Sequence, residues 1–222
     1  KYKGQLTGTI GLAGTFSMFY SHHICSMEGG VVVTNDSMLY EYMLSIRAHG
    51  WTRNLTPGSA IYEKNEDPFY EKYNFIMPGY NLRPLEIEAA IGIEQIDKIE
   101  SIIANRRSNA DYFLSEIKKT LSFRTQNEVG ESSWFGFPMI LERTDLSRDK
   151  IVTYLENRGI ETRPIVAGNF VRNKAVEYLN YRVYGELINA DFIHYNGFFV
   201  GNHSYDNREK IKKMFALIEK YK

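Results

Sequence analysis

The sequence has few of the residues and runs that mark several classes of protein. A single cysteine, Cys25, among 222 residues excludes an internal disulfide and any metal or iron–sulfur site that needs four cysteines. No stretch approaches the ~20 consecutive apolar residues of a membrane-spanning helix. The residues after Lys1 also lack the apolar run of a signal peptide. These absences predict a cytoplasmic protein with no membrane contact and no metal centre.

The sequence also has no excess of charge of either sign. Its 27 lysine and arginine residues balance 27 aspartate and glutamate residues, which argues against a nucleic-acid-binding protein. Apolar residues make up 43% and aromatic residues 14% of the chain, too much for a disordered protein. At ~150 residues per domain, the length fits one large domain or one and a half small ones.

The first part of the chain is predicted to hold two short strands, a helix and a long loop. The strands are expected at residues 15–19 and 31–34, and Asp36 is placed to cap a helix that continues to about Ala48. Residues 49–78 show no clean periodicity. A loop of about 30 residues in a compact domain is uncommon, and it is usually functional or part of an interface.

The remainder of the chain alternates strands with helices, which predicts one α/β layer. Pro84 is expected to open a long helix that continues, with room for a bend, to about Leu121. A polar linker at residues 126–132 precedes a second domain, so we predict domains at 1–125 and 126–222. In the second domain, strands are predicted at residues 134–141, 160–163 and 197–201, and helices at residues 147–158, 185–195 and 207–221.

Residues that could take part in a reaction lie in and just after the first predicted strand. Ser17 comes five residues before His22, and a Gly29-Gly30 pair follows, which allows backbone to approach a ligand closely. A histidine in a turn more often has a structural role. The whole run nevertheless resembles the DegT/DnrJ/EryC1/StrS family of vitamin B6-dependent sugar enzymes, which carries a Phe-Ser…Lys…Glu-Gly-Gly pattern at this place. Counting back six residues from Glu28 puts His22 where that family has its cofactor-anchoring lysine.

A second block, residues 79–92 (GYNLRPLEIEAAIG), resembles the same family, and the resemblance covers essentially the whole chain. It implies an α/β fold of the aspartate aminotransferase type, fold type I of the PLP enzymes. The chain would hold the last strands of the large-domain sheet, the long connecting helix and the small α/β C-terminal domain. Family members are near twice this length, and their amino-terminal half carries the aspartate that pairs with the cofactor's ring nitrogen. We therefore expect little catalysis from this chain alone.

The histidine at the lysine position points to a particular reaction. An imidazole forms no stable imine, so the cofactor stays as free pyridoxamine 5′-phosphate, and histidine supplies a base that titrates near neutral pH. The resemblance then implies a dehydratase that removes the C3 hydroxyl of a GDP-linked 4-keto-6-deoxy hexose, in 3,6-dideoxysugar synthesis. Glutamate would donate the amine that converts pyridoxal 5′-phosphate back to pyridoxamine 5′-phosphate. A related branch holds an iron–sulfur cluster on four cysteines, which this chain cannot supply.

Roles in catalysis and cofactor binding follow from the resemblance. His22 would be the single acid/base, with His23 as a candidate that the register disfavours. Ser17 would bind the cofactor phosphate, or would only end a strand with a hydrogen bond. Asn81 would reach the phosphate of the neighbouring subunit's cofactor in a homodimer with shared active sites, or would only cap a helix.

Roles in substrate binding follow in the same way. The implied residues are Ser21, His49, Arg53, Arg83, Glu161 and Arg163. Arginine can grip a diphosphate with two hydrogen bonds. The structural alternatives are a solvated loop charge for Arg53 and a surface ion pair for Glu161 with Arg163. Two other functions stay open, a PLP-dependent nucleotide-sugar aminotransferase that has lost its lysine and a non-catalytic dimerisation module.

Overall fold

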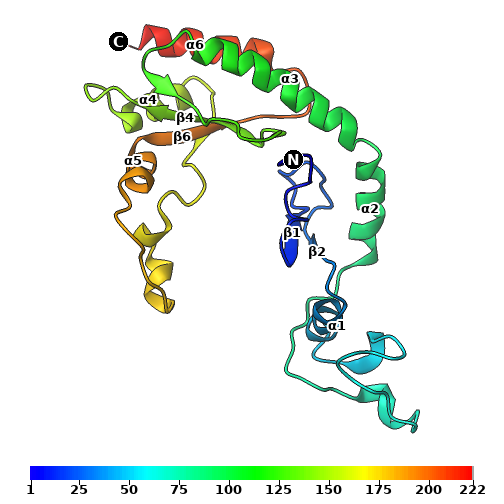
Figure 1. The fold of residues 1–222 in the computed structure, drawn as a ribbon. Helices are drawn as coiled ribbons and strands as arrows, with labels where there is room; N and C mark the ends of the chain where they lie inside the picture. The colour runs from blue at the N-terminus through cyan, green and yellow to red at the C-terminus, as the bar shows by residue number, and fades with distance from the viewer. Residues whose placement is uncertain (222) are drawn as a thin grey trace. The chain divides into compact units, whose positions relative to one another are not determined.

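The computed structural model describes residues 1–221, which form two compact units (Figure 1). Unit 1 comprises residues 1–99, and unit 2 begins at Glu100. Within the described residues, no helix is both long enough and apolar enough to cross a membrane. The division into domains at residues 125 and 126 stays a prediction, because a compact unit of packing need not be a domain.

Unit 1 starts with a two-stranded ribbon and a helix. Strand β1 (Ala13–Ser17) pairs antiparallel with β2 (Gly30–Thr34). Helix α1 (Ser37–Ile46) follows, and the Asp36 carboxylate accepts a hydrogen bond from the N–H of Leu39 at 2.9 Å. This cap satisfies one of the N–H groups that a helix start leaves without a partner. Both predicted strands and the predicted cap are present, although β1 begins and ends two residues earlier than predicted.

An irregular segment, residues 47–81, which we call the arm, connects α1 to the next helix. It contains two short 3-10 helices, η1 (Thr52–Asn54) and η2 (Tyr70–Tyr73), and otherwise has no regular structure beyond isolated bridges. The long loop predicted here is therefore confirmed. The arm lies at the end of unit 1 that carries α1 (Figure 1).

The long helix expected from Pro84 is two helices, α2 (Glu86–Ile96) and α3 (Ile99–Ile117). Pro84 lies two residues before α2 begins, not in its first turn. Lys98 donates its N–H to the carbonyl of Gln95 at 3.1 Å, a tighter bond than the α-helical one, which closes α2. The bend allowed by the sequence is thus a break between two helices.

Unit 2 is built around a four-stranded sheet in the order β3–β4–β6–β5, with every neighbouring pair antiparallel. The strands are β3 (Phe123–Arg124), β4 (Gly136–Leu141), β5 (Thr162–Arg163) and β6 (Gly197–Gly201). The sequence pattern predicts β4, β5 and β6, whereas β3 is not among the predicted strands.

Helices complete unit 2 and enclose its core. They are α4 (Arg148–Glu156), α5 (Ile188–Asn196) and α6 (Arg208–Lys220), all within predicted ranges to a few residues. The rings of Phe113 and Phe137 stack with centroids 4.5 Å apart at the centre of the core. The largest apolar side chains that are fully buried are Phe113, Phe137, Met139, Leu141, Ile151, Leu155 and Phe198.

Candidate functional site

Residues 18–29 join β1 to β2 and carry the candidate catalytic histidine. The base of this turn is closed where Met18 donates its N–H to the carbonyl of Gly29 at 3.1 Å. Ser26 donates its N–H to Met18 at 2.9 Å, and its buried hydroxyl donates to the carbonyl of Glu28 at 2.6 Å. These bonds order the turn without regular secondary structure.

The predicted catalytic and phosphate-binding residues lie at the start of this turn. Ser17 ends β1 opposite Gly30, and its hydroxyl oxygen accepts the N–H of Phe19 at 3.3 Å. The strand-end hydrogen bond considered as an alternative is therefore present, and it does not use the hydroxyl hydrogen. His22 donates its N–H to the carbonyl of Phe19 at 2.9 Å, which places a half-buried imidazole in the turn. Ser21 beside it is exposed.

Two glycines let the turn approach helix α2. Gly29 has a φ of +96°, and a Cβ added to it would lie 3.4 Å from Oε2 of Glu88. A Cβ on the buried Gly92 would lie 2.9 Å from the terminal methyl of Met18. Both contacts join the first sequence block to the second. The two blocks that carry the family resemblance thus pack against each other.

A second group of predicted residues gathers where the arm begins and ends. His49 donates its N–H to the carbonyl of Tyr80 at 2.9 Å, and Leu82 donates its N–H to the carbonyl of Arg47 at 2.8 Å. This antiparallel bridge pairs Ala48 with Asn81, so His49 lies next to the residue opposite Asn81. The sequence gives no sign of the pairing, because the paired segments are about 30 residues apart and neither alternates as a strand would.

The pairing needs glycine at two positions. A Cβ on Gly50 would lie 1.7 Å from the carbonyl oxygen of Met77, and a Cβ on Gly79 would lie 2.4 Å from the nitrogen of Gly50. Gly50 also has a φ of +83°, a conformation that costs other residues free energy. The two ends of the arm can therefore cross this closely only with glycine at both places.

Arg53 on η1 is exposed, but its guanidinium group contacts an aromatic ring. Its guanidinium carbon lies 5.0 Å from the centre of the Trp51 ring, a cation–π contact. Trp51 in turn stacks on Tyr73 and Phe75, with ring centroids 5.5 Å and 5.8 Å away, and donates its indole N–H to the carbonyl of Lys72 at 3.2 Å. Arg53 is thus more constrained than an ordinary solvated charge.

Asn81 does not cap a helix. The residue at the cap of α2 is Leu85, four positions further on, so the structural alternative for Asn81 is wrong. Its side-chain oxygen instead accepts a hydrogen bond from Nε of Arg83 at 3.3 Å. Both side chains are exposed. Their hydrogen bond uses the carboxamide oxygen of Asn81 and does not use its N–H groups, which can donate to a ligand.

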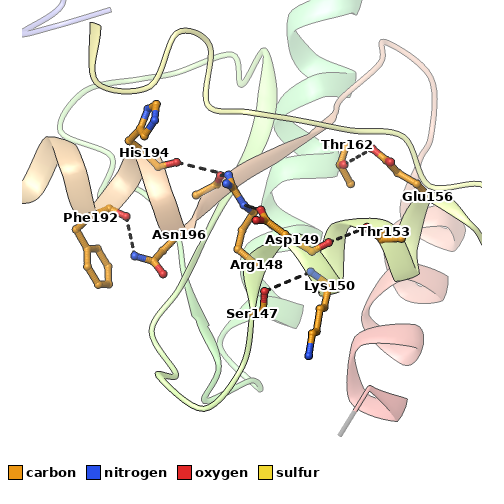
Figure 2. Close-up of polar contacts among 11 residues, drawn as sticks. Ser147, Arg148, Asp149, Lys150, Thr153, Glu156, Thr162, Phe192, His194 and Asn196 are labelled. Carbon is orange, nitrogen blue, oxygen red and sulfur yellow. Dashed lines mark hydrogen bonds and ion pairs between the residues drawn. The ribbon is translucent and has the colours of Figure 1, made fainter. Parts of the chain in front are cut away.

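Glu161 and Arg163 form an exposed ion pair at β5 in unit 2. Nη2 and Nε of Arg163 donate to the same oxygen of Glu161 at 2.7 Å and 3.2 Å. Between them, the buried Thr162 donates its hydroxyl to Glu156 of α4 at 2.7 Å (Figure 2). The surface pair expected as an alternative is present, and the role of this pair in substrate binding stays a prediction.

The segment after β5 is tied to α5 by side chains that the sequence pattern does not single out. His194 accepts the N–H of Asn169 at its Nδ1 at 3.2 Å. Asp191 accepts Nδ2 of Asn169 at 2.7 Å, and Nε and Nη2 of Arg172 at 2.9 Å and 2.6 Å. The Arg172 guanidinium and then the Asn169 amide lower the pKa of Asp191 to about 2. The Gly168-Asn169 pair in the sequence signals a turn but not its partners.

Arg148 at the start of α4 contacts the C-terminal end of α5. Its Nη1 donates to the carbonyls of Gly197 at 3.0 Å and His194 at 3.5 Å, at the C-terminal end of α5 (Figure 2). Positive charge at a helix C-terminus is favourable. Across residues 1–221, no group of three or more histidine, cysteine, aspartate or glutamate side chains is arranged to hold a metal ion.

The fold of this chain is that of the PLP-dependent enzymes with the aminotransferase fold. The E. coli GDP-4-keto-6-deoxy-D-mannose-3-dehydratase, solved with bound hydrated PLP, superposes with a TM-score of 0.94 at 45% identity, covering 98% of this chain and 57% of that one. A second structure of a GDP-4-keto-6-deoxymannose-3-dehydratase, a histidine-to-asparagine variant with bound GDP-perosamine, gives 0.95 at 45% identity over the same shares. The predicted fold class is confirmed.

The chain belongs to the DegT/DnrJ/EryC1/StrS aminotransferase family, whose model matches residues 1–219. Among curated relatives, the GDP-4-keto-6-deoxy-D-mannose 3-dehydratase of Yersinia pseudotuberculosis is 49% identical over 223 residues, which is 99% of this chain and 57% of that protein. The family prediction is confirmed. The chain spans little more than half the length of the relatives that it matches.

Proposed function

We propose that this chain is the part of a pyridoxamine 5′-phosphate-dependent sugar dehydratase that carries the acid/base histidine. The assembled enzyme would remove the C3 hydroxyl of a GDP-linked 4-keto-6-deoxy hexose. The observation that carries this proposal is His22, held in the ordered turn after β1 at the position where the family pattern has lysine. The similarity to the dehydratases reported above supports it.

The residues present suit the amine form of the cofactor. No lysine occurs from residue 4 to residue 63, so the turn and the first half of the arm offer no side-chain amine for covalent attachment. Ser17 would bind the cofactor phosphate through its hydroxyl, and Asn81 would bind the phosphate of the cofactor in the neighbouring subunit. The bound cofactor would supply the amine that condenses with the sugar C4 ketone and would take up the electrons released there.

His22 would move the protons of the reaction. As a neutral imidazole it would accept a proton from the cofactor carbon that carries the amine, and it would return a proton to the C3 hydroxyl oxygen as water leaves. His22 is half-buried, so its ring is held in the turn and can still be reached by a bound cofactor and sugar. His23 is the alternative base, one residue out of register with the family pattern.

The remaining predicted residues would bind the sugar nucleotide. Arg53 and Arg83 would bind the diphosphate, and Ser21 and His49 would contact the sugar. Glu161 and Arg163, already oriented by their ion pair, would also contact the substrate. We expect a homodimer that acts in the cytoplasm and uses glutamate to regenerate the amine form of the cofactor.

The test is to co-express this chain with the amino-terminal part of the Yersinia dehydratase that it does not match. We expect the pair, and not the chain alone, to convert a GDP-4-keto-6-deoxy sugar to a 3-deoxy product with release of ammonia. A 4-amino sugar as product would indicate the aminotransferase. A stable oligomer that binds no pyridoxamine phosphate would indicate a non-catalytic module.

The substitution His22→Lys tests the register directly. In the same assembly, the lysine should attach pyridoxal 5′-phosphate covalently, which gives a visible absorption band, and dehydration should be lost. The matched control is His23→Lys, which we expect to leave the cofactor unattached. Attachment by His23→Lys and not by His22→Lys would move the catalytic role to His23.

A further inference from the structure

One carboxylate in the arm of unit 1 joins several of its segments. Glu71 of η2 accepts the hydroxyl of Thr52 at 3.0 Å, the hydroxyl of Tyr62 at 2.6 Å and the N–H of Asn65 at 2.7 Å. Asn74 extends the network by donating to the Tyr62 hydroxyl at 2.6 Å. A carboxylate that accepts several hydrogen bonds in one place fixes segments that have no secondary structure of their own.

One of these bonds fixes the backbone that carries Arg53. Thr52 is fully buried, and it also donates its N–H to the carbonyl of Asn74 at 3.0 Å. Leu55 donates its N–H back to the carbonyl of Thr52 at 3.0 Å, which closes η1 around Arg53. Two hydrogen bonds of Thr52 therefore hold the turn that carries Arg53: the hydroxyl of Thr52 donates to Glu71, and its backbone N–H donates to Asn74.

We propose that Glu71 is a positioning residue that holds η1 so that the Arg53 guanidinium can bind the diphosphate of the sugar nucleotide. This inference rests on the function proposed above for Arg53. Glu71 does not itself touch substrate. It acts through the Thr52 hydroxyl, and the Trp51 ring contacts the Arg53 guanidinium directly.

The electrostatics of the network agree with a carboxylate that stays charged. The hydrogen bond from the Tyr62 hydroxyl, followed by those from Asn65 and Thr52, lowers the pKa of Glu71 below its usual value. The same bond raises the pKa of Tyr62, so the phenol keeps its proton and remains a donor. Glu71 is therefore ionised, and the network intact, across the neutral pH range.

The chain offers a matched control in Glu41 of α1. Its carboxylate also accepts three hydrogen bonds, from the hydroxyls of Thr56 and Ser59 at 2.8 Å and 2.7 Å and from the N–H of Ala60 at 2.9 Å. These bonds hold the part of the arm that follows η1 and do not involve Thr52. The substitution Glu41→Gln thus removes a carboxylate with a similar set of hydrogen bonds to the arm, and it leaves the hydrogen bonds of Thr52 in place.

The first experiment measures kinetics of the assembled enzyme with GDP-4-keto-6-deoxy-D-mannose. We expect Glu71→Gln to raise KM by about tenfold and to change kcat by less than about twofold, because a hydrogen-bonded charge is lost while His22 is untouched. Arg53→Ala should raise KM at least as much, and adding Glu71→Gln to it should raise KM no further. Glu41→Gln should leave KM unchanged.

Other outcomes separate the two proposals. If Arg53→Ala raises KM and Glu71→Gln does not, or if the two effects multiply in the double variant, the positioning role is overturned and the function of Arg53 stands. If Arg53→Ala leaves KM unchanged, the assigned role of Arg53 is wrong, and the positioning proposal falls with it.

The second experiment uses the chain itself and needs no activity. Trp51 lies on the partly exposed arm and Trp134 is buried, so acrylamide quenching of the tryptophan emission reports mainly on Trp51. We expect Glu71→Gln to increase the quenchable fraction and Glu41→Gln to change it less. Equal quenching in the wild type and in Glu71→Gln would show that Glu71 does not hold η1, and would overturn the proposal.

Discussion

The two units of this chain are stabilised by different means. Of the 20 apolar side chains buried among the described residues, 18 lie in unit 2, and only Ala48 and Leu55 lie in unit 1. Unit 1 is instead held by the close approach of backbone segments at Gly50 and Gly79 and by hydrogen bonds to the carboxylates of Glu41 and Glu71. Unit 2 should therefore tolerate the loss of a polar contact, whereas unit 1 should respond to small changes in its backbone and hydrogen bonds.

Exposure of apolar side chains shows the same contrast. Phe16, Tyr20 and Val32 on or near the β1–β2 ribbon are 40%, 63% and 50% exposed. Burial of such side chains is the main driving force of folding, so unit 1 gains less from its own packing than unit 2 does. Predictions that compare substitutions in the two units can test this difference.

The largest expected effect is in the core of unit 2. Phe113→Ala removes a fully buried ring that contacts Phe137, Phe215 and Trp134, and should lower the free energy of unfolding of this unit by about 3–5 kcal/mol. Urea unfolding followed by Trp134 emission would measure it. The control Tyr184→Ala removes a ring that is 94% exposed and should change stability little. Equal losses in both variants would contradict an apolar core centred on Phe113.

A smaller effect is expected at the crossing of the arm in unit 1. Gly50→Ala and Gly58→Ala both place a side chain on a backbone with φ near +80°, which costs ~1–2 kcal/mol in each case. Gly50→Ala also forces its Cβ against the Met77 carbonyl, which adds ~1–3 kcal/mol, whereas nothing lies within 4 Å of the added Cβ at Gly58. Limited proteolysis of the arm should be faster in Gly50→Ala. Equal rates in the two variants would show that the crossing is not tight.

The smallest effect concerns the charge of Asp191 in unit 2. Its pKa is lowered in the folded state to about 2, so its contribution to stability is complete above pH ~4 and is lost as the pH falls through about 2. The wild type should therefore lose more stability between pH 5 and pH 2 than Asp191→Asn does, as urea titrations would measure.

Asp206 provides the control for this prediction. Its pKa is also about 2, because of hydrogen bonds from Arg208, but that pairing is local to one turn. Asp191→Asn should therefore speed amide hydrogen exchange at Asn169 and Val171, and Asp206→Asn should not. Unchanged exchange in Asp191→Asn would show that the segment after β5 is held by other contacts.

Local signals in the sequence predict most of the regular structure. Asp36 caps α1, and Ser147 accepts the N–H of Lys150 at the start of α4, both as their residue types favour. Gly159, with φ +77°, ends the same helix region as expected of a glycine stop. These features depend on residues a few positions apart, which is the range over which sequence patterns carry structural information.

The supports of the candidate site could not be predicted in this way. Glu71 meets Thr52 across 19 positions and Asp191 meets Asn169 across 22, and in each pair at least one partner lies in a segment with no predicted helix or strand. A charged residue in such a segment is usually solvated, so its type alone does not reveal a partner. His22 could be singled out only because its neighbours Ser17 and Glu28 fix a register with a known pattern.

The lengths of the strands have a consequence for self-association. The outer strands of the unit 2 sheet, β3 and β5, have two residues each, which offers a foreign strand almost no template to pair with. β1 and β2 have five residues each and pair only with one another among the described residues, so each leaves one side open. Aggregation of this chain should therefore begin at the ribbon that holds Ser17, not at the sheet of unit 2.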